Sequence, residues 1–137
     1  MTNSSPVSEN DDSRFDGVRV LVVEDNRPNQ IVAARLLAGL GCAVDLADDG
    51  LSAVEMLRET RYDIVLMDIH MPKLDGFATT RTIRHMEGEG MHVPIVAMTA
   101  HVVAGMRERC LAAGVDDFVA KPISMSSLRR VLPKRNE

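Results

Sequence analysis

The chain alternates between short apolar runs and longer stretches in which apolar residues recur every three or four positions. The short runs are typical of β-strands and cover residues 18–23, 42–47, 64–67, 93–98 and 115–120. The longer stretches predict helices over 28–40, through Ala53 and Leu57, over 76–86, over 102–113, and from an N-cap at Ser124 onward. Strands that alternate with helices in this way favour an α/β fold, with a parallel sheet covered by helices on both faces.

The first helical stretch shows how its boundaries and its apolar face are inferred. Pro28 suits the first turn of a helix, where a backbone N–H would have no partner in any case. The helical period places Ile31, Ala34, Leu37 and Ala38 together. We therefore predict that these four residues form the apolar face of this helix.

Composition separates the chain into a polar leader and one folded unit. Residues 1–16 are rich in Ser, Asn, Asp and Glu, so we predict a flexible leader or linker there. The folded domain is expected over 17–132, followed by a short tail at 133–137. Because so few residues follow position 132, no DNA-binding output domain is expected after it.

Charge and cysteine usage exclude several classes of function. The net charge is −4, and no basic stripe is available to meet phosphates, which argues against nucleic-acid binding. Cys42 and Cys110 lie in apolar surroundings and are predicted to be free thiols in a reduced compartment. No apolar run approaches the roughly 20 residues that span a bilayer, and no signal peptide is evident. We therefore expect a cytoplasmic domain without membrane contact.

Polar groups stand at the ends of four apolar runs. Glu24 and Asp25 follow the first run, Asp68 follows the third, Thr99 the fourth and Lys121 the fifth. Parallel strands with right-handed crossovers place their carboxyl ends on one edge, where ligands of such sheets bind. These five side chains are therefore expected to converge on one site.

The chemistry that fits this group is phosphoryl transfer with a hard cation. Clustered carboxylates repel one another unless a positive charge lies among them, and oxygen-only ligands suit Mg²⁺. Asp68 is the natural nucleophile, because a carboxylate can accept a phosphoryl group as an acyl phosphate. The Lys121 ammonium and the Thr99 hydroxyl would then stabilise charge on the transferred group.

Each of these residues alone also has an ordinary structural explanation. Glu24 and Asp25 would suit a helix N-terminus, Asp68 a turn, Thr99 a helix cap, and Lys121 the surface. Their joint placement at successive strand ends is what favours a shared site. A zinc site is not favoured, since the two nearest histidines lack a cysteine partner at ligand spacing. The glycine-rich motifs of dinucleotide-binding and P-loop proteins are absent from the sequence.

Four segments, in order, resemble the receiver domain of two-component response regulators. They are Val22-Val23-Glu24-Asp25-Asn26, Leu66-Met67-Asp68-Ile69-His70-Met71-Pro72-Lys73-Leu74-Asp75-Gly76, Ala97-Met98-Thr99-Ala100 and Asp116-Asp117-Phe118-Val119-Ala120-Lys121-Pro122. The resemblance covers residues 17–132. It implies a flavodoxin-like, doubly wound, five-stranded parallel sheet of order 2-1-3-4-5 with five helices.

The resemblance also implies a role for each matching residue. Asp68 would be the phospho-acceptor and a Mg²⁺ ligand, together with Glu24, Asp25 and the backbone carbonyl of His70. Thr99 would be the switch hydroxyl. The fourth segment would supply the remaining roles. Phe118 would be the rotating aromatic residue, and Lys121 would be the phosphate partner, with a cis peptide bond to Pro122.

Finer features are similar to receivers attached to hybrid sensor histidine kinases, and a stand-alone regulator is the alternative. The expected partner is a histidine kinase or a histidine phosphotransfer protein. Its histidine-bearing helix is expected to dock on helix 28–40 near Ile31, Ala34 and Arg35. The domain itself would catalyse only its own phosphorylation and dephosphorylation, and its oligomeric state is left open.

Two rival functions follow from the same residues. A hydrolase of the haloacid dehalogenase type also forms an aspartyl phosphate, but its nucleophile follows the first strand in an Asp-x-Asp motif, whereas this strand ends in Glu24-Asp25-Asn26. A pseudo-receiver would be an interaction module that is never phosphorylated. The complete set of acidic, hydroxyl and ammonium groups argues against that reading.

Overall fold

The computed structural model of the chain describes residues 12–71 and 75–134. Its strands are β1 (Arg19–Val23), β2 (Ala43–Ala47), β3 (Ile64–Asp68), β4 (Ile95–Thr99) and β5 (Asp117–Ala120). Its helices are a 3₁₀ turn η1 (Asp12–Phe15), α1 (Arg27–Gly39), α2 (Gly50–Glu59), α3 (Gly76–Met86), α4 (Met106–Ala113) and α5 (Met125–Val131). Most of the predicted leader, the motif residues Pro72, Lys73 and Leu74, and the last residues of the tail lie outside the described residues.

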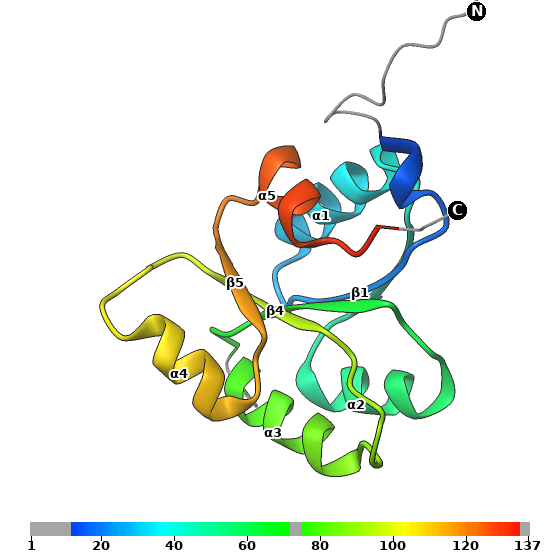
Figure 1. Ribbon diagram of the computed structural model, residues 1–137. Helices are drawn as coiled ribbons and strands as arrows, with labels where there is room; N and C mark the ends of the chain where they lie inside the picture. Colours follow the sequence, from blue (N-terminus) through cyan, green and yellow to red (C-terminus); the bar gives the residue numbers. More distant parts are fainter. Residues whose placement is uncertain (1–11, 72–74, 135–137) are drawn as a thin grey trace, which may run out of the picture.

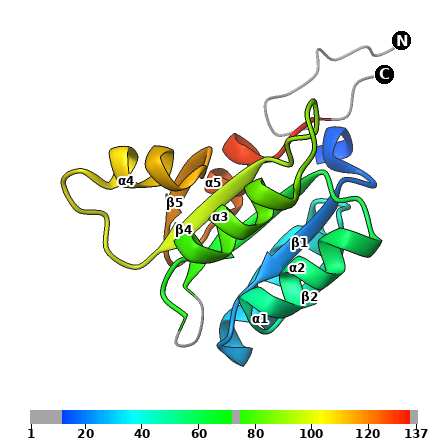
Figure 2. The same cartoon turned by 90° about the horizontal axis from the view of Figure 1, so that it is seen from below.

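The five strands form one parallel sheet in the order β2-β1-β3-β4-β5. This confirms the predicted α/β architecture and its strand order. Helices α1 and α5 lie on one face with η1, and α2, α3 and α4 lie on the other (Figure 1). Figure 2 shows the same arrangement from the side of α2 and α3. All strands therefore end on one edge, as right-handed crossovers require.

Alternating side chains of the central strands build two cores. Leu21 and Val65 point toward α2 and α3, whereas Val20 and Ile64 point toward α1 and α5. Apart from Arg19 at the start of β1 and Asp68 at the end of β3, both strands are apolar because both of their faces are covered. The cysteines predicted to be free, Cys42 and Cys110, are indeed buried thiols.

Several predicted elements begin later than the apolar pattern suggested. The fourth helix starts at Met106 rather than at residue 102, because Gly105 takes a left-handed conformation with φ of 83° and serves as its N-cap. Strand β4 starts at Ile95, since Pro94 has no N–H to contribute to the ladder. Strand β5 starts at Asp117, because the Asp116 carboxylate binds the Ile95 N–H instead.

The apolar face predicted for the first helix was only partly right, because Leu37 is buried as predicted but Ile31, Ala34 and Ala38 are not. The inward side of α1 consists of Gln30, Ala33 and Leu37, while Ile31 is 38% exposed. The inward row has ordinary helical spacing, but it contains a glutamine, which hid it from a search for apolar residues.

The predicted boundary of the leader also needs correction. Phe15 is 1% exposed and packs in the core beneath α1 and α5. Gly17 continues this contact through a hydrogen bond from its N–H to the carbonyl of Gly41. The folded unit therefore includes η1 and does not begin at residue 17. Burial of the phenylalanine side chain contributes about 2 kcal/mol to the stability of the fold.

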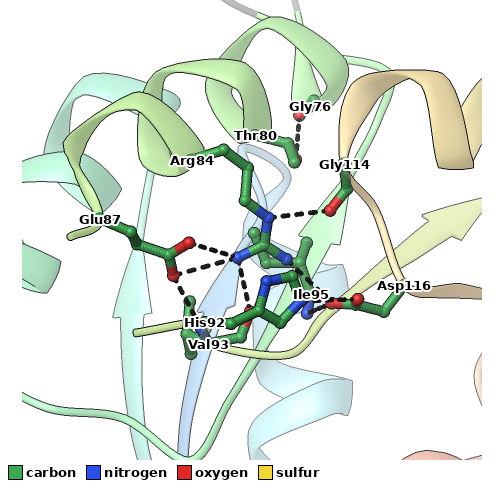
Figure 3. Close-up of polar contacts among 9 residues, drawn as sticks. All are labelled: Gly76, Thr80, Arg84, Glu87, His92, Val93, Ile95, Gly114 and Asp116. Carbon is green, nitrogen blue, oxygen red and sulfur yellow. Dashed lines mark hydrogen bonds and ion pairs between the residues drawn. The ribbon is translucent and has the colours of Figure 1, made fainter. Parts of the chain in front are cut away.

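Arg84 organises the sheet edge opposite the strand ends that carry the predicted site (Figure 3). Its guanidinium donates to the carbonyls of Gly114 and Val93 at 2.9 Å each and to both carboxylate oxygens of Glu87 at 2.9 and 3.0 Å. It also pairs with Asp116 at 2.9 Å. Arg84 thus ties the end of α3 to the segments that precede β4 and β5.

Tyr62 provides a pH-dependent contribution to stability at the start of β3. Its hydroxyl donates to the Asp45 carboxylate, and the Arg19 guanidinium lies 5.7 Å from its ring centroid. Burial, together with the hydrogen bond to Asp45 and the charge of Asp45, raises the pKa of Tyr62 from 10.0 to about 12. The folded state therefore holds this proton more tightly than the unfolded chain does.

We expect the stabilisation from Tyr62 to be complete below pH 10 and lost as the pH rises through about 12. The chain has one tyrosine and no tryptophan, so tyrosinate absorbance follows Tyr62 alone. The native protein should titrate with a midpoint near 12. Tyr62→Phe should lose stability less steeply than the wild type above pH 10. A midpoint near 10 with native circular dichroism would contradict this account.

Candidate functional site

The strand ends bring the predicted polar residues to one edge of the sheet. Glu24 directly follows β1, Asp68 and Thr99 are the last residues of β3 and β4, and Lys121 directly follows β5. The parallel register aligns these ends, because Asp68 pairs with Met98 one residue before Thr99. The Lys121 N–H then donates to the Thr99 carbonyl at 2.7 Å. The predicted convergence is therefore present in the fold.

Lys121 bridges two buried carboxylates at the centre of this edge. Its Nζ lies 3.1 Å from Glu24 Oε1 and 3.2 Å from Asp68 Oδ2. Glu24 and Asp68 are 1% and 2% exposed. Their remaining oxygens accept backbone N–H groups, from Asn26 at 3.1 Å and from His70 at 2.9 Å. Both carboxylates are thus held in fixed orientations.

The burial of this cluster shifts its proton affinities. Burial raises the pKa of the Glu24 carboxyl above its ordinary 4.5, and the nearby Asp68 charge adds to the rise, while the Asn26 N–H and Lys121 oppose it. Burial alone would lower the pKa of Lys121, but the hydrogen bond to Glu24 and the charge of Asp68 outweigh it, so this pKa is raised. Lys121 consequently stays charged at neutral pH.

Thr99 and Phe118 lie beside this cluster in a defined arrangement. The Thr99 side chain is fully buried, and its Oγ1 accepts the His101 N–H at 3.1 Å. The same oxygen lies 3.4 Å from Nε2 of His70, and the two histidine rings are 6.5 Å apart. Phe118 is half-buried, and the Arg107 guanidinium covers its ring at 5.5 Å.

The acidic residues fit a hard divalent cation. Ligand atoms of Glu24, Asp25 and Asp68 lie within 4.8 Å of one another, and Asp25 is exposed to solvent. Three carboxylates face the single ammonium of Lys121, so a further positive charge would reduce their repulsion. A donor set of oxygen atoms only, open on one side to water, favours Mg²⁺ over transition metals.

Two polar residues near the site were missed in the sequence. Gln30, on the inward side of α1, is 2% exposed and donates to the Glu24 carbonyl at 2.6 Å. Asn26 caps α1 by accepting the Asn29 N–H at 2.9 Å. The available signal was the position of Gln30 in the same helical row as Ala33 and Leu37, because a buried polar residue needs a partner.

Gly76 allows the start of α3 to approach the end of β3 closely. A Cβ atom at this position would lie 2.6 Å from the Asp68 carbonyl oxygen and 2.7 Å from Ile69 Cα. Both are backbone atoms, which cannot yield as a flexible side chain would. The backbone around Asp68 therefore depends on this glycine.

We expect Gly76→Ala to lower the free energy of unfolding by about 2 kcal/mol, even though alanine normally favours helices. Urea unfolding would measure the change. Gly88→Ala is the matched control, because a Cβ at Gly88 meets nothing within 4 Å. Equal stability of the two variants would show that the close approach at Gly76 is relieved at no cost.

Comparison with known proteins decides the family. The model of the response regulator receiver domain matches residues 20–132. The chain belongs to the receiver domain family. One relative is Probable histidine kinase 1 of Oryza sativa subsp. indica, which is 34% identical over 144 residues that include 83% of this chain. The receiver spans only 3 to 15% of the length of the first curated relatives.

Solved receiver structures share the fold. The receiver domain of sensor histidine kinase PA1611 from Pseudomonas aeruginosa PAO1, which has a magnesium ion in its active site cleft, is 45% identical with a TM-score of 0.75, and the match covers 84% of this chain and 93% of that one. The receiver domain of Ssk1 from Saccharomyces cerevisiae, solved with the phosphotransfer protein Ypd1, is 28% identical with a TM-score of 0.78, over 86% and 88% of the two chains.

No helix in the described part of the receiver is both long and apolar enough to cross a membrane.

Proposed function

We propose that this receiver takes a phosphoryl group from a phosphohistidine onto Asp68 and thereby switches a protein-interaction surface. The observation that carries the proposal is the position of Asp68, buried at a strand end and joined through Lys121 to Glu24. A carboxylate held in this way is oriented for attack, and a nearby ammonium is available for the incoming negative charge.

In the proposed reaction, a carboxylate oxygen of Asp68 attacks the phosphorus atom of the phosphohistidine. The new O–P bond forms as the P–N bond breaks, and the electron pair stays on the imidazole, which takes a proton from water. Lys121 keeps its charge and lies 3.2 Å from Asp68, so it is placed to pair with the phosphoryl oxygens. The reaction needs no other nucleophile.

Glu24, Asp25, Asp68 and the backbone carbonyl of His70 are proposed to hold Mg²⁺. When bound, the cation would supply charge neutralisation for the phosphoryl group. The geometry of the three carboxylates supports this assignment. The magnesium ion in the similar PA1611 receiver supports it as well.

Thr99 and Phe118 are the proposed switch residues. A phosphoryl group adds about −1.5 to −2 charges near neutral pH, so the Thr99 hydroxyl, which donates to the His101 carbonyl at 3.1 Å, would donate to the phosphoryl group instead. Phe118 would then turn toward the space beside Thr99. Phosphorylation in this scheme shifts the balance between two arrangements of the same elements and does not build a new structure.

The exposed side of α1 is the proposed docking surface for the phosphohistidine partner. Ile31 and Val32 are 38% and 47% exposed, and Arg35 is also exposed. A hollow of about 90 Å³ beside Val32 is lined by Glu24, Lys121 and Pro122, so the surface reaches the phospho-acceptor site. The Ssk1 receiver bound to Ypd1 supports a histidine phosphotransfer protein, or a histidine kinase, as this partner.

The relatives support a hybrid histidine kinase as the parent of this receiver. We place the action of the receiver in the cytoplasm as part of the same proposal. A stand-alone regulator is the alternative. A phosphotransfer assay with a kinase core encoded in the same reading frame would distinguish the hybrid kinase from the stand-alone regulator.

Acetyl phosphate labelling tests the proposed function. With Mg²⁺ present, intact mass analysis should show the addition of one phosphoryl group, and hydroxylamine should remove it, because acyl phosphates are labile to this nucleophile. Chelation of Mg²⁺ should prevent labelling. A wild-type protein that stays unlabelled would instead be a pseudo-receiver, and turnover of a phosphomonoester in excess over protein would indicate a hydrolase.

His70 is expected to influence how long the phosphoryl group persists. Its ring lies beside Thr99 and is exposed at the mouth of the site, where water must enter. We expect His70→Ala to change the half-life of the phosphorylated protein by about threefold or more, because a contact to the switch hydroxyl is lost. Decay of the labelled species measures this. His85→Ala, far along α3, should leave the half-life unchanged.

A further inference from the structure

Both the oxygen and the nitrogen of the Gln30 side-chain amide form hydrogen bonds. Nε2 donates to the Glu24 carbonyl at 2.6 Å and to Asp48 Oδ1 at 2.7 Å. Oε1 accepts from Nη1 of Arg27 at 3.1 Å. Because Gln30 is 2% exposed, water is poorly placed to replace these partners. The residue therefore links α1 to the segments that follow β1 and β2.

The contact with Glu24 restrains the backbone that carries the acidic pair. The Glu24 N–H donates to the Ala47 carbonyl at 3.0 Å, and its carbonyl accepts from Gln30. On the other side, the Asn26 N–H binds Glu24 Oε2. The exposed Asp25 carboxylate has no hydrogen bond or ion pair with the described part of the chain, so the backbone on either side of it sets its position.

We propose that Gln30 is a positioning residue that sets the Mg²⁺ affinity of the receiver by holding the Glu24–Asp25 backbone in place. The inference rests on the proposed Mg²⁺ site. A methionine of similar length would occupy the same place on the inward side of α1, but it would leave the Glu24 carbonyl without its donor. The turn would then be free to relax, and the two carboxylates would no longer be held ready for the cation.

Isothermal titration with Mg²⁺ alone tests this role. We expect Gln30→Met to raise the Kd for Mg²⁺ about fivefold to tenfold, the size expected from one hydrogen bond that holds a ligand in place. Asp48→Ala removes the second acceptor of the Gln30 amide. The loss of Mg²⁺ binding free energy should be about half of the loss in Gln30→Met. The Kd of the double variant for Mg²⁺ should lie within about twofold of the Kd of Gln30→Met, because both substitutions act through one side chain.

A control separates positioning from general loss of stability. Tyr62→Phe removes a part-buried hydrogen bond between the segment before β3 and Asp45 of β2, and it should leave the Kd for Mg²⁺ unchanged. All titrations are made at a temperature where circular dichroism shows every variant folded. Urea unfolding of the same samples gives the stability separately.

The outcomes distinguish this inference from the proposed function. If the wild type binds Mg²⁺ and Asp25→Asn weakens binding, the site is established. An unchanged Kd in Gln30→Met would then overturn the positioning role alone, whatever happens to stability. If the wild type binds no Mg²⁺, the proposed site and the role of Gln30 both fall.

Discussion

Replacing Asp68 by asparagine is expected to abolish phosphoryl uptake while leaving the receiver folded. Asparagine keeps an oxygen that can accept the His70 N–H, which lies 2.9 Å away in the wild type. It lacks the charged oxygen that attacks phosphorus. We expect labelling by acetyl phosphate to fall by more than about a thousandfold, the order of effect seen when a catalytic nucleophile is removed.

The stability of this variant should change by only about 1 kcal/mol. Lys121 loses one partner but keeps Glu24 at 3.1 Å, and the repulsion between two buried carboxylates is relieved. Asp63→Asn is the matched control, because Asp63 precedes the same strand at its other end and accepts the Arg19 N–H. Asp63→Asn should label like the wild type. Persistent labelling of Asp68→Asn would place the acceptor elsewhere.

Replacing Arg84 by methionine is expected to lower the free energy of unfolding by about 3 kcal/mol. The Arg84 side chain is only 17% exposed, and its loss leaves the 12% exposed Glu87 carboxylate without its cation. The carbonyls of Gly114 and Val93 lose their donor as well. Lysine cannot reproduce the fork of the guanidinium, so Arg84→Lys should recover only part of the loss.

Urea unfolding of Arg84→Met measures this effect, with Arg58→Met as its control. The Arg58 side chain is 58% exposed and pairs with Glu55 at 3.8 Å, so its loss should cost less than about 0.5 kcal/mol. Phosphoryl labelling of folded Arg84→Met should remain close to that of the wild type, since Arg84 lies at the other edge of the sheet. A similar loss in the two arginine variants would show that the network contributes little.

The positions of the site residues could be predicted from the sequence because parallel strands leave little freedom. Once β3 and β4 are in register, Asp68 and Thr99 must end at the same edge of the sheet, and the apolar runs that define the strands also define where they end. The predicted helix 76–86 coincides with α3 for a similar reason, since its apolar residues and its Asp75 cap agree.

Contacts that depend on a single side chain could not be predicted in this way. Gln30 is polar, so its place in the buried row of α1 contradicts the apolar pattern and is explained only by its partners on two other segments. Phe15 stands alone in a polar leader, and no period shows that it reaches the core. Gly105 sets the start of the fourth helix through a backbone conformation that composition does not reveal.

The ion pairs of Lys121 connect the segment after the last strand with Glu24, which follows the first strand, and with Asp68. The site is therefore complete only when the whole sheet is folded. A ligand that binds only the complete fold stabilises it by mass action, and this stabilisation grows with the logarithm of the ligand concentration above Kd. Binding of a cation at the proposed site would therefore protect the folded receiver from proteolysis. A chain cut between β1 and β5 would separate Glu24 from Lys121, so a damaged receiver would lose the ion pairs that join the two ends of the site.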